Sequence, residues 1–298
     1  MSATAKLAGF AAVLLLVFGG AVAVGGAIGP ERDGSDAAGT DDAMSAHGGD
    51  EAAPGGDEAA HGGEATADPV RGLAASHDGL TLELEQTQLE RGRPTELRFG
   101  IVGSDGQPVR DFEVEHEKRM HFIVVRRDGR GFQHLHPELG DDGAWRVELT
   151  LPAAGSYRVF ADFKDDGEAR TLAADLAVDG EADYAPLPAP ATSADTGDGY
   201  DVRLDADSIR AGRETELGFT VTRDGEAIET EPYLGAGGHL VALREGDLAY
   251  LHVHPEGHGG DAVDFMTEFP SEGRYRLYLQ FKHEGQVHTA EFTQEVGR

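Results

Sequence analysis

The amino-acid sequence predicts an all-β protein, in which two tandem antiparallel β-sandwiches follow one N-terminal hydrophobic helix. Short runs of alternating apolar and polar residues, separated by Gly, Pro and Asp, fill residues 70–180 and 200–298. Motifs of the first region recur in the second. One uncharged run lies near the N-terminus, and no later segment has a convincing helical period.

Residues 1–29 are the expected targeting segment. Lys6 precedes an uncharged run over residues 7–29, which at ~1.5 Å per residue can cross a ~30 Å hydrocarbon core. The run is either a signal peptide with a small-residue cleavage motif at residues 21–23 or a retained anchor, and we favour the anchor because the apolar stretch continues past that motif. Both alternatives export the rest of the chain, either as a single-pass protein of the cell membrane with extracytoplasmic domains or as a secreted protein.

Two further segments read as linkers. Residues 30–69 consist largely of Gly, Ala, Asp and Glu, and so little apolar material predicts disorder. Residues 181–199 are rich in Pro and Ala and predict a linker between the two sandwiches.

Composition excludes several classes of function. The formal net charge of -30 argues against a nucleic-acid partner and favours cations near the surface. There are no cysteines, so disulfides, iron–sulfur clusters, cysteine-based zinc sites and blue-copper centres are impossible. We expect contact with the membrane only through the N-terminal helix.

The repeat also indicates the type of sandwich. The segment LPAAGSYRVFADF at 151–163 matches FPSEGRYRLYLQF at 269–281. In each copy a Gly-x-Tyr motif enters a strand, as at the tyrosine corner of immunoglobulin-like domains, where the hydroxyl group bonds to upstream backbone. Tyr157 and Tyr275 are therefore predicted to have this structural role.

Three histidines recur at the same spacing in both copies. The second follows the first by thirteen residues, the third follows the second by two, and a proline comes next. Side chains at i and i+2 of a strand share a face, and a hairpin brings the first histidine to that face. Three imidazoles suit Cu(II), Zn(II) or Ni(II). The predicted ligands are His121, His134 and His136 in one site and His239, His252 and His254 in the other.

Two more side chains are candidate ligands. Met120 precedes His121, and its thioether would favour Cu(I) if it turned toward the site, although methionine is also a common core residue. His288 shares strand parity with Ala290 and Phe292, so it could point inward as a fourth ligand in the second domain or face solvent at the tip of a hairpin.

The stretches KRMHFIVVRRDGRGFQHLHPEL and GGHLVALREGDLAYLHVHPEG resemble secreted or membrane-anchored bacterial copper-handling proteins with immunoglobulin-like or cupredoxin-like sandwiches, the YtkA-like and CopC-like domains. The resemblance covers residues 75–180 and 200–298. It implies extracytoplasmic metal binding without catalysis, with copper as the expected ion and zinc as the alternative, for metal buffering, delivery or resistance. A membrane copper transporter or another metallochaperone is the implied partner. The sequence lacks the N-terminal histidine and Met-rich loop of CopC-like proteins.

Two other classes of function remain open from the residues alone. A cupin-like metalloenzyme also uses His-x-His, with a carboxylate for which Asp141 or Asp261 would serve, but His121 has no place in that pattern. A metal-free surface or adhesion module is the other alternative. No arrangement of residues in the sequence predicts a catalytic site.

Overall fold

The computed structural model describes residues 70–251, 253–256 and 262–298. The predicted N-terminal helix and the linker at 30–69 lie outside these residues. These described residues belong to one compact unit. Within the described ranges the structure contains strands and no helix, which confirms the all-β prediction for this part. Among these residues there is accordingly no helix of the length and apolarity that a membrane span requires.

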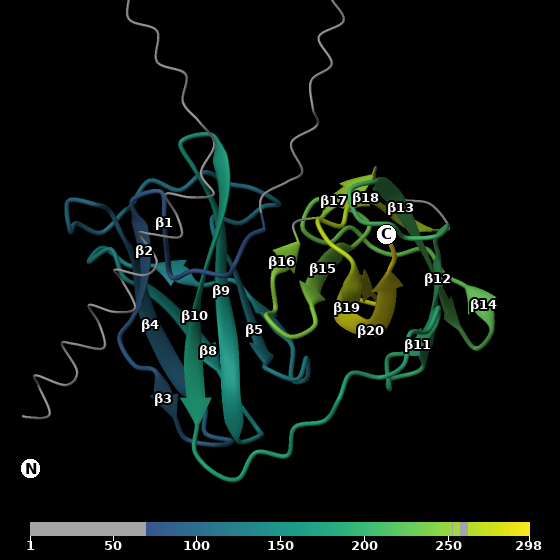
Figure 1. The fold of residues 1–298 in the computed structure, drawn as a ribbon, viewed down its shortest axis with the longest axis horizontal. Coiled ribbons are helices and arrows are strands. Elements are labelled where there is room, and N and C mark those ends of the chain that lie inside the picture. Colours follow the sequence, from purple (N-terminus) through teal and green to yellow (C-terminus); the bar gives the residue numbers. More distant parts are fainter. Residues whose placement is uncertain (1–69, 252, 257–261) are drawn as a thin grey trace, which may run out of the picture. The chain divides into compact units, whose positions relative to one another are not determined.

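The first domain packs two five-stranded sheets against each other (Figure 1). All neighbouring strands are antiparallel except the pair β3 and β10. One sheet has the order β1 (Ser76–His77), β2 (Leu80–Leu84), β4 (Thr95–Val102), β8 (Trp145–Leu149) and β7 (Glu138–Leu139). The other has the order β3 (Gln88–Leu89), β10 (Glu168–Val178), β9 (Gly155–Asp165), β5 (His121–Arg126) and β6 (Gln133–Leu135).

The second domain repeats this arrangement. One sheet has the order β11 (Ser193–Asp195), β12 (Tyr200–Asp205), β13 (Glu214–Arg223), β18 (Val263–Glu268) and β17 (His254–Glu256), with β14 (Glu226–Ala227) paired to β13. The other has the order β16 (Tyr250–Leu251), β15 (His239–Arg244), β19 (Gly273–His283) and β20 (Gln286–Val296). Strand β11 lies inside the predicted linker 181–199. Its residues form a strand because their backbone pairs with β12, and a Pro- and Ala-rich composition does not reveal this contact.

Both predicted tyrosine corners are present. The hydroxyl of Tyr157 donates to the carbonyl oxygen of Ala153 at 2.9 Å, and that of Tyr275 donates to the carbonyl oxygen of Ser271 at 3.1 Å. Each ring is buried in the core of its own domain. These bonds fix the start of β9 and β19, the long strands that carry residues of the site described below.

Strand β5 is buried along its whole length because both of its faces are covered. Phe122 and Val124 belong to the core of the first domain. Ile123 and Val125 belong to a third apolar cluster that joins β5, β9 and β10 to β15, β16 and β19 of the second domain. A strand with two covered faces reads as a continuous apolar run instead of an alternating one.

The third cluster therefore joins the two domains. Phe132 stacks on Tyr278 with ring centroids 4.1 Å apart, and the Tyr278 hydroxyl donates to the carbonyl oxygen of Gly129 at 2.7 Å. Aromatic stacking and a satisfied buried hydroxyl both add to the apolar burial at this contact. The histidines of the first domain lie next to this interface.

Candidate metal centre

The three histidines of the first domain come together on the outer face of the β5–β6 hairpin. His121 begins β5, and His134 lies on β6 opposite Ile123. His136 follows the end of β6 at Leu135, so it is not on the same strand as His134, contrary to the sequence prediction. One ring nitrogen from each residue lies within 4.8 Å of the other two.

The neighbours of His121 determine which of its nitrogens carries the proton. Its Nε2 atom lies 3.1 Å from the carbonyl oxygen of Glu115. A carbonyl oxygen only accepts hydrogen bonds, so Nε2 of the neutral ring holds the proton and donates. The Nδ1 atom of His121 consequently carries no proton, and its lone pair faces His134.

The second domain fixes the proton of His134 in the same way. The Nε2 atom of Gln280, on β19, donates to the Oγ1 atom of Thr289 at 3.4 Å, which orients the amide. Its Oε1 atom then accepts from Nδ1 of His134 at 2.7 Å. The Nε2 atom of His134 is left with a lone pair, 2.9 Å from Nδ1 of His121. Two lone pairs therefore face each other, an arrangement that a cation between them would stabilise.

His136 contributes a third nitrogen. Its ring centroid is 5.2 Å from that of His121 and 4.7 Å from that of His134. Its Nε2 atom is buried and has no hydrogen-bond partner. Buried polar atoms are almost always paired, so an orphaned one calls for a specific explanation such as an ion. The donor set of three imidazole nitrogens fits a transition-metal ion.

Burial keeps these rings neutral. Desolvation lowers the pKa of His134 to about 3 and that of His136 to about 4, with the neighbouring imidazoles adding to the effect. Desolvation also lowers the pKa of His121, partly offset by the negative charge of Asp162. Metal ions bind the neutral imidazole, so protons do not compete with a metal at neutral pH.

A buried carboxylate lies behind the cluster. Asp162 pairs with His121 across β5 and β9 and is 6% exposed. Its Oδ1 atom accepts from the Thr171 hydroxyl at 2.7 Å, and its Oδ2 atom accepts from the Tyr250 hydroxyl of the second domain at 3.1 Å. This negative charge favours a cation at the histidines.

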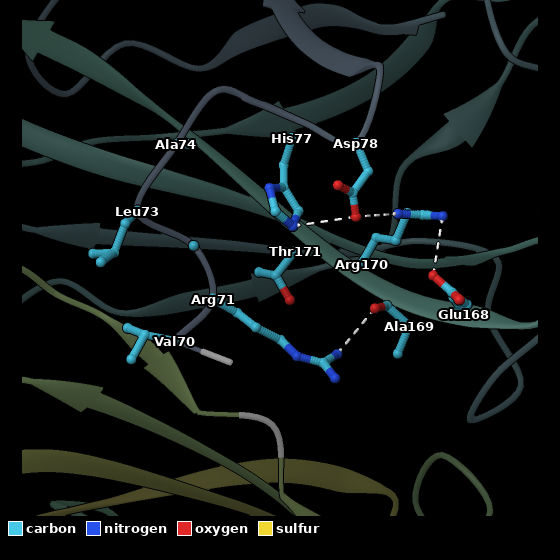
Figure 2. Close-up of a pocket in the computed structure, with 11 residues that line it drawn as sticks. Val70, Arg71, Leu73, Ala74, His77, Asp78, Glu168, Ala169, Arg170 and Thr171 are labelled. Carbon is cyan, nitrogen blue, oxygen red and sulfur yellow. Dashed lines mark hydrogen bonds and ion pairs between the residues drawn. The ribbon is translucent and has the colours of Figure 1, made fainter. Parts of the chain in front are cut away.

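A pocket of about 360 Å³ is lined in part by Thr171, the residue whose hydroxyl donates to Asp162. Figure 2 shows that its charged side chains are engaged with one another: Arg170 pairs with Asp78 and Glu168. Arg71 donates to the carbonyl oxygen of Ala169. Two acidic side chains therefore balance the charge of Arg170.

The structure describes the predicted ligands of the second domain only in part. His239 begins β15, whereas His254 begins β17 in the opposite sheet. His252 and the side chain of His254 lie outside the described residues. The His239 ring instead approaches the first domain, with its centroid 4.7 Å from that of His134. In the described part of the chain, the histidines of the first domain form the one cluster of three or more metal-ligating side chains.

Met120 and His288 lie away from the cluster. Met120 precedes His121 on the opposite face of the chain and packs in the core of the first domain. His288 points into the second domain, which is one of the two orientations that the sequence left open, and there it pairs with Asp198 at 2.6 Å and contacts the Tyr200 ring. Neither side chain adds a ligand to the three ring nitrogens.

Sequence reasoning missed two contributors to the site and one neighbouring histidine. Gln280 and Asp162 were not predicted because their roles depend on contacts between strands and domains. His116 has a positive φ of 47° in the loop before β5, and its ring centroid is 6.1 Å from that of His121. The alternative carboxylate Asp141 is exposed and lies outside the cluster, and Asp261 lies outside the described residues.

Fold and site together define a protein with two tandem immunoglobulin-like β-sandwich domains and a three-histidine cluster. The chain belongs to the family described as Domain of unknown function (DUF8832), whose model matches residues 75–180 and again 194–298. This double match confirms the predicted tandem repeat, and the comparisons identify no copper-handling family. No curated protein matches the chain significantly.

Solved structures with similar folds include three modular proteins. The Lin-41 filamin domain shares 14% identity over 36% of this chain and 97% of its own, with a TM-score of 0.24. The Escherichia coli adhesin FdeC shares 15% over 76% of this chain and 66% of its own, with a TM-score of 0.26. A chimeric titin Z1Z2 tandem shares 13% over 74% of this chain and 100% of its own, with a TM-score of 0.21. At scores this low the similarities carry no argument about function.

Proposed function

We propose that this chain is an extracytoplasmic transition-metal-binding protein that holds one ion at His121, His134 and His136, with Cu(II) as the preferred ion and Zn(II) as the alternative. The observation that carries the proposal is the convergence of three neutral imidazole nitrogens, two with lone pairs face to face and one buried without a partner. The export of the domains follows from the sequence of residues 1–29.

The separation of two nitrogens supports copper. An ion ~2.0–2.1 Å from both Nδ1 of His121 and Nε2 of His134, which lie 2.9 Å apart, would subtend an angle of roughly 90° between them. Angles of this size belong to tetragonal Cu(II) sites, whereas zinc prefers tetrahedral ones. Copper also stands above zinc in intrinsic affinity for nitrogen ligands.

Binding without catalysis is the simplest role for this site. The nearby carboxylate, Asp162, accepts hydrogen bonds on both oxygens and lies on β9, opposite His121. It stabilises a cation but is poorly placed to move a proton for a substrate. A protein that holds a metal ion in this way suits buffering, or delivery to a membrane transporter or another metallochaperone.

The test is a titration of the purified protein with Cu(II) and Zn(II) against a competing chelator, which removes loosely held metal. We expect one tightly bound equivalent in the wild type and none in the His134→Ala/His136→Ala double variant. The control is His77→Ala, which removes an exposed histidine of the same domain. Equal binding by the wild type and the double variant, or no binding by the wild type, would contradict the proposal. Circular dichroism of the metal-free proteins checks that each one folds.

A further inference from the structure

The His239 ring of the second domain lies beside the rings of His121 and His134. Its centroid is 4.7 Å from that of His134 and 5.4 Å from that of His121, and the planes of His239 and His121 differ by 8°. Imidazoles that share an ion at a metal–nitrogen distance of ~2.0–2.1 Å have centroids roughly 5 Å apart. The distances among the three first-domain rings fall in the same range, from 4.7 to 5.2 Å.

The backbone of the second domain holds His239 in this place. In the register of β15 and β19, His239 is directly opposite Gln280, so the two side chains share one face of the sheet. Gln280 is the residue that accepts the hydrogen bond from Nδ1 of His134. The adjacent residues Gln280 and His239 therefore have related roles. Gln280 orients His134 of the first domain, and His239 places an imidazole beside it.

The surroundings also favour a fixed approach. His239 is 9% exposed, and the apolar cluster that joins the two domains includes Val241 and Leu243 of the same strand. Alternate residues of a strand share a face, so His239 continues this apolar row toward the cluster. The ring is thus part of a packed interface and not a mobile surface group.

We propose that His239 is a fourth ligand to the ion held by the first domain, so that metal binding clamps the two sandwiches together. This inference rests on the proposed metal site. It replaces the two separate sites that the repeat predicts with one shared site, because His239 cannot serve both. The empty protein would keep its apolar interface, and the loaded protein would add bonds from both domains to one ion.

The test combines metal affinity with hydrogen exchange on the full-length protein. In the wild type, one equivalent of Cu(II) should slow amide exchange in β15 and β19 as well as in β5. In His239→Ala, the cluster should still bind one equivalent, but at least tenfold more weakly, and the slowing of exchange in β15 and β19 should be lost. His239→Asn serves as a second variant, which keeps a polar side chain but removes the imidazole.

The matched control is His283→Gln, which removes a second-domain histidine that contacts Tyr200 instead of the cluster. It should bind Cu(II) as the wild type does. If His239→Ala and His239→Asn bind with wild-type affinity and show wild-type metal-dependent protection of the second domain, the fourth-ligand inference is overturned while the three-histidine site stands. If the wild type itself takes up no ion, the proposed function fails, and the inference fails with it.

Discussion

The Nδ1 atom of His121 lies 2.9 Å from the Nε2 atom of His134, and the acceptors around the two rings leave a lone pair on each of these atoms. The backbone carbonyl oxygen of Glu115, in the first domain, accepts a hydrogen bond from Nε2 of His121. The Oε1 atom of Gln280, in the second domain, accepts one from Nδ1 of His134. The site is therefore prepared for a cation by contacts on both sides of the domain interface. Four predictions follow from these contacts and from the packing around them.

Replacing Gln280 should weaken metal binding without removing it. Gln280→Leu eliminates the acceptor that orients His134 and holds its proton on Nδ1. Partners of this kind typically contribute 10–100-fold to affinity. Gln280→Glu keeps an acceptor and should retain most of the affinity. Competition titrations with Cu(II) measure both variants, and equal affinity for Gln280→Leu and the wild type would show that the amide plays no part.

Acid should destabilise the metal-free protein between about pH 6.5 and pH 3. The pKa of His134 is lowered to about 3 and that of His136 to about 4, below the value of ~6.5 in the unfolded chain. The unfolded state therefore takes up protons first as the pH falls, and each histidine costs up to about 1.4 kcal/mol per pH unit in this window. Above the window these groups add no pH dependence.

The measurement for this pH dependence is thermal unfolding followed by the fluorescence of Trp145, the one tryptophan of the chain. The wild type should lose stability with falling pH more steeply than the His134→Gln/His136→Gln variant. Parallel profiles for the two proteins would mean that the buried imidazoles do not govern the acid response.

Gly72→Ala should be markedly more destabilising than Gly212→Ala. Both glycines have φ of +67°, which costs a residue with a Cβ ~1–2 kcal/mol. At Gly72 the added Cβ would also lie 2.8 Å from the Phe160 ring and 2.9 Å from the Cβ of Tyr250, whereas nothing lies within 4 Å at Gly212. The steric overlap falls on the contact between domains. Equal falls in melting temperature would refute this assignment.

Tyr250→Phe should loosen the contact between the domains. It removes a hydrogen bond to the buried Oδ2 atom of Asp162, and a hydrogen bond to a charged group contributes about 1.5–3 kcal/mol. Tyr184→Phe, at a half-exposed ring whose hydroxyl accepts from the backbone of Ser156, is the comparison and should cost less. Denaturant unfolding of both variants gives the two free energies, and the reverse order would count against a structural role for the Tyr250 hydroxyl.

Much of the fold follows from local patterns in the sequence. Alternating apolar residues and turn signals indicated the sandwiches, and the Gly-x-Tyr motifs located the hydroxyl bonds of Tyr157 and Tyr275. The spacing of His121, His134 and His136 predicted a cluster that a hairpin brings together. Each of these features depends on residues that are close in the chain or paired within one sheet, where period and spacing carry the information.

The rest of the site depends on contacts that no local pattern encodes. His239 has the same spacing to the next two histidines of its repeat as His121 has in the first. It faces the first domain because the apolar residues Val241 and Leu243 of β15 pack against β5 and β9. Met120 follows strand parity into the core and so does not reach the cluster. Gln280 gains its role only because the two domains meet, more than one hundred residues apart in sequence from His134.

X-ray absorption spectroscopy of the Cu(II)-loaded protein tests the central claim most directly, because it reports the atoms around the ion. We predict one ion per chain, with at least three imidazole nitrogens at ~2.0–2.1 Å and with the scattering pattern of coordinated histidine rings reduced in the His134→Ala/His136→Ala variant. A shell of oxygen atoms without imidazole, or a spectrum that this variant leaves unchanged, would contradict the account.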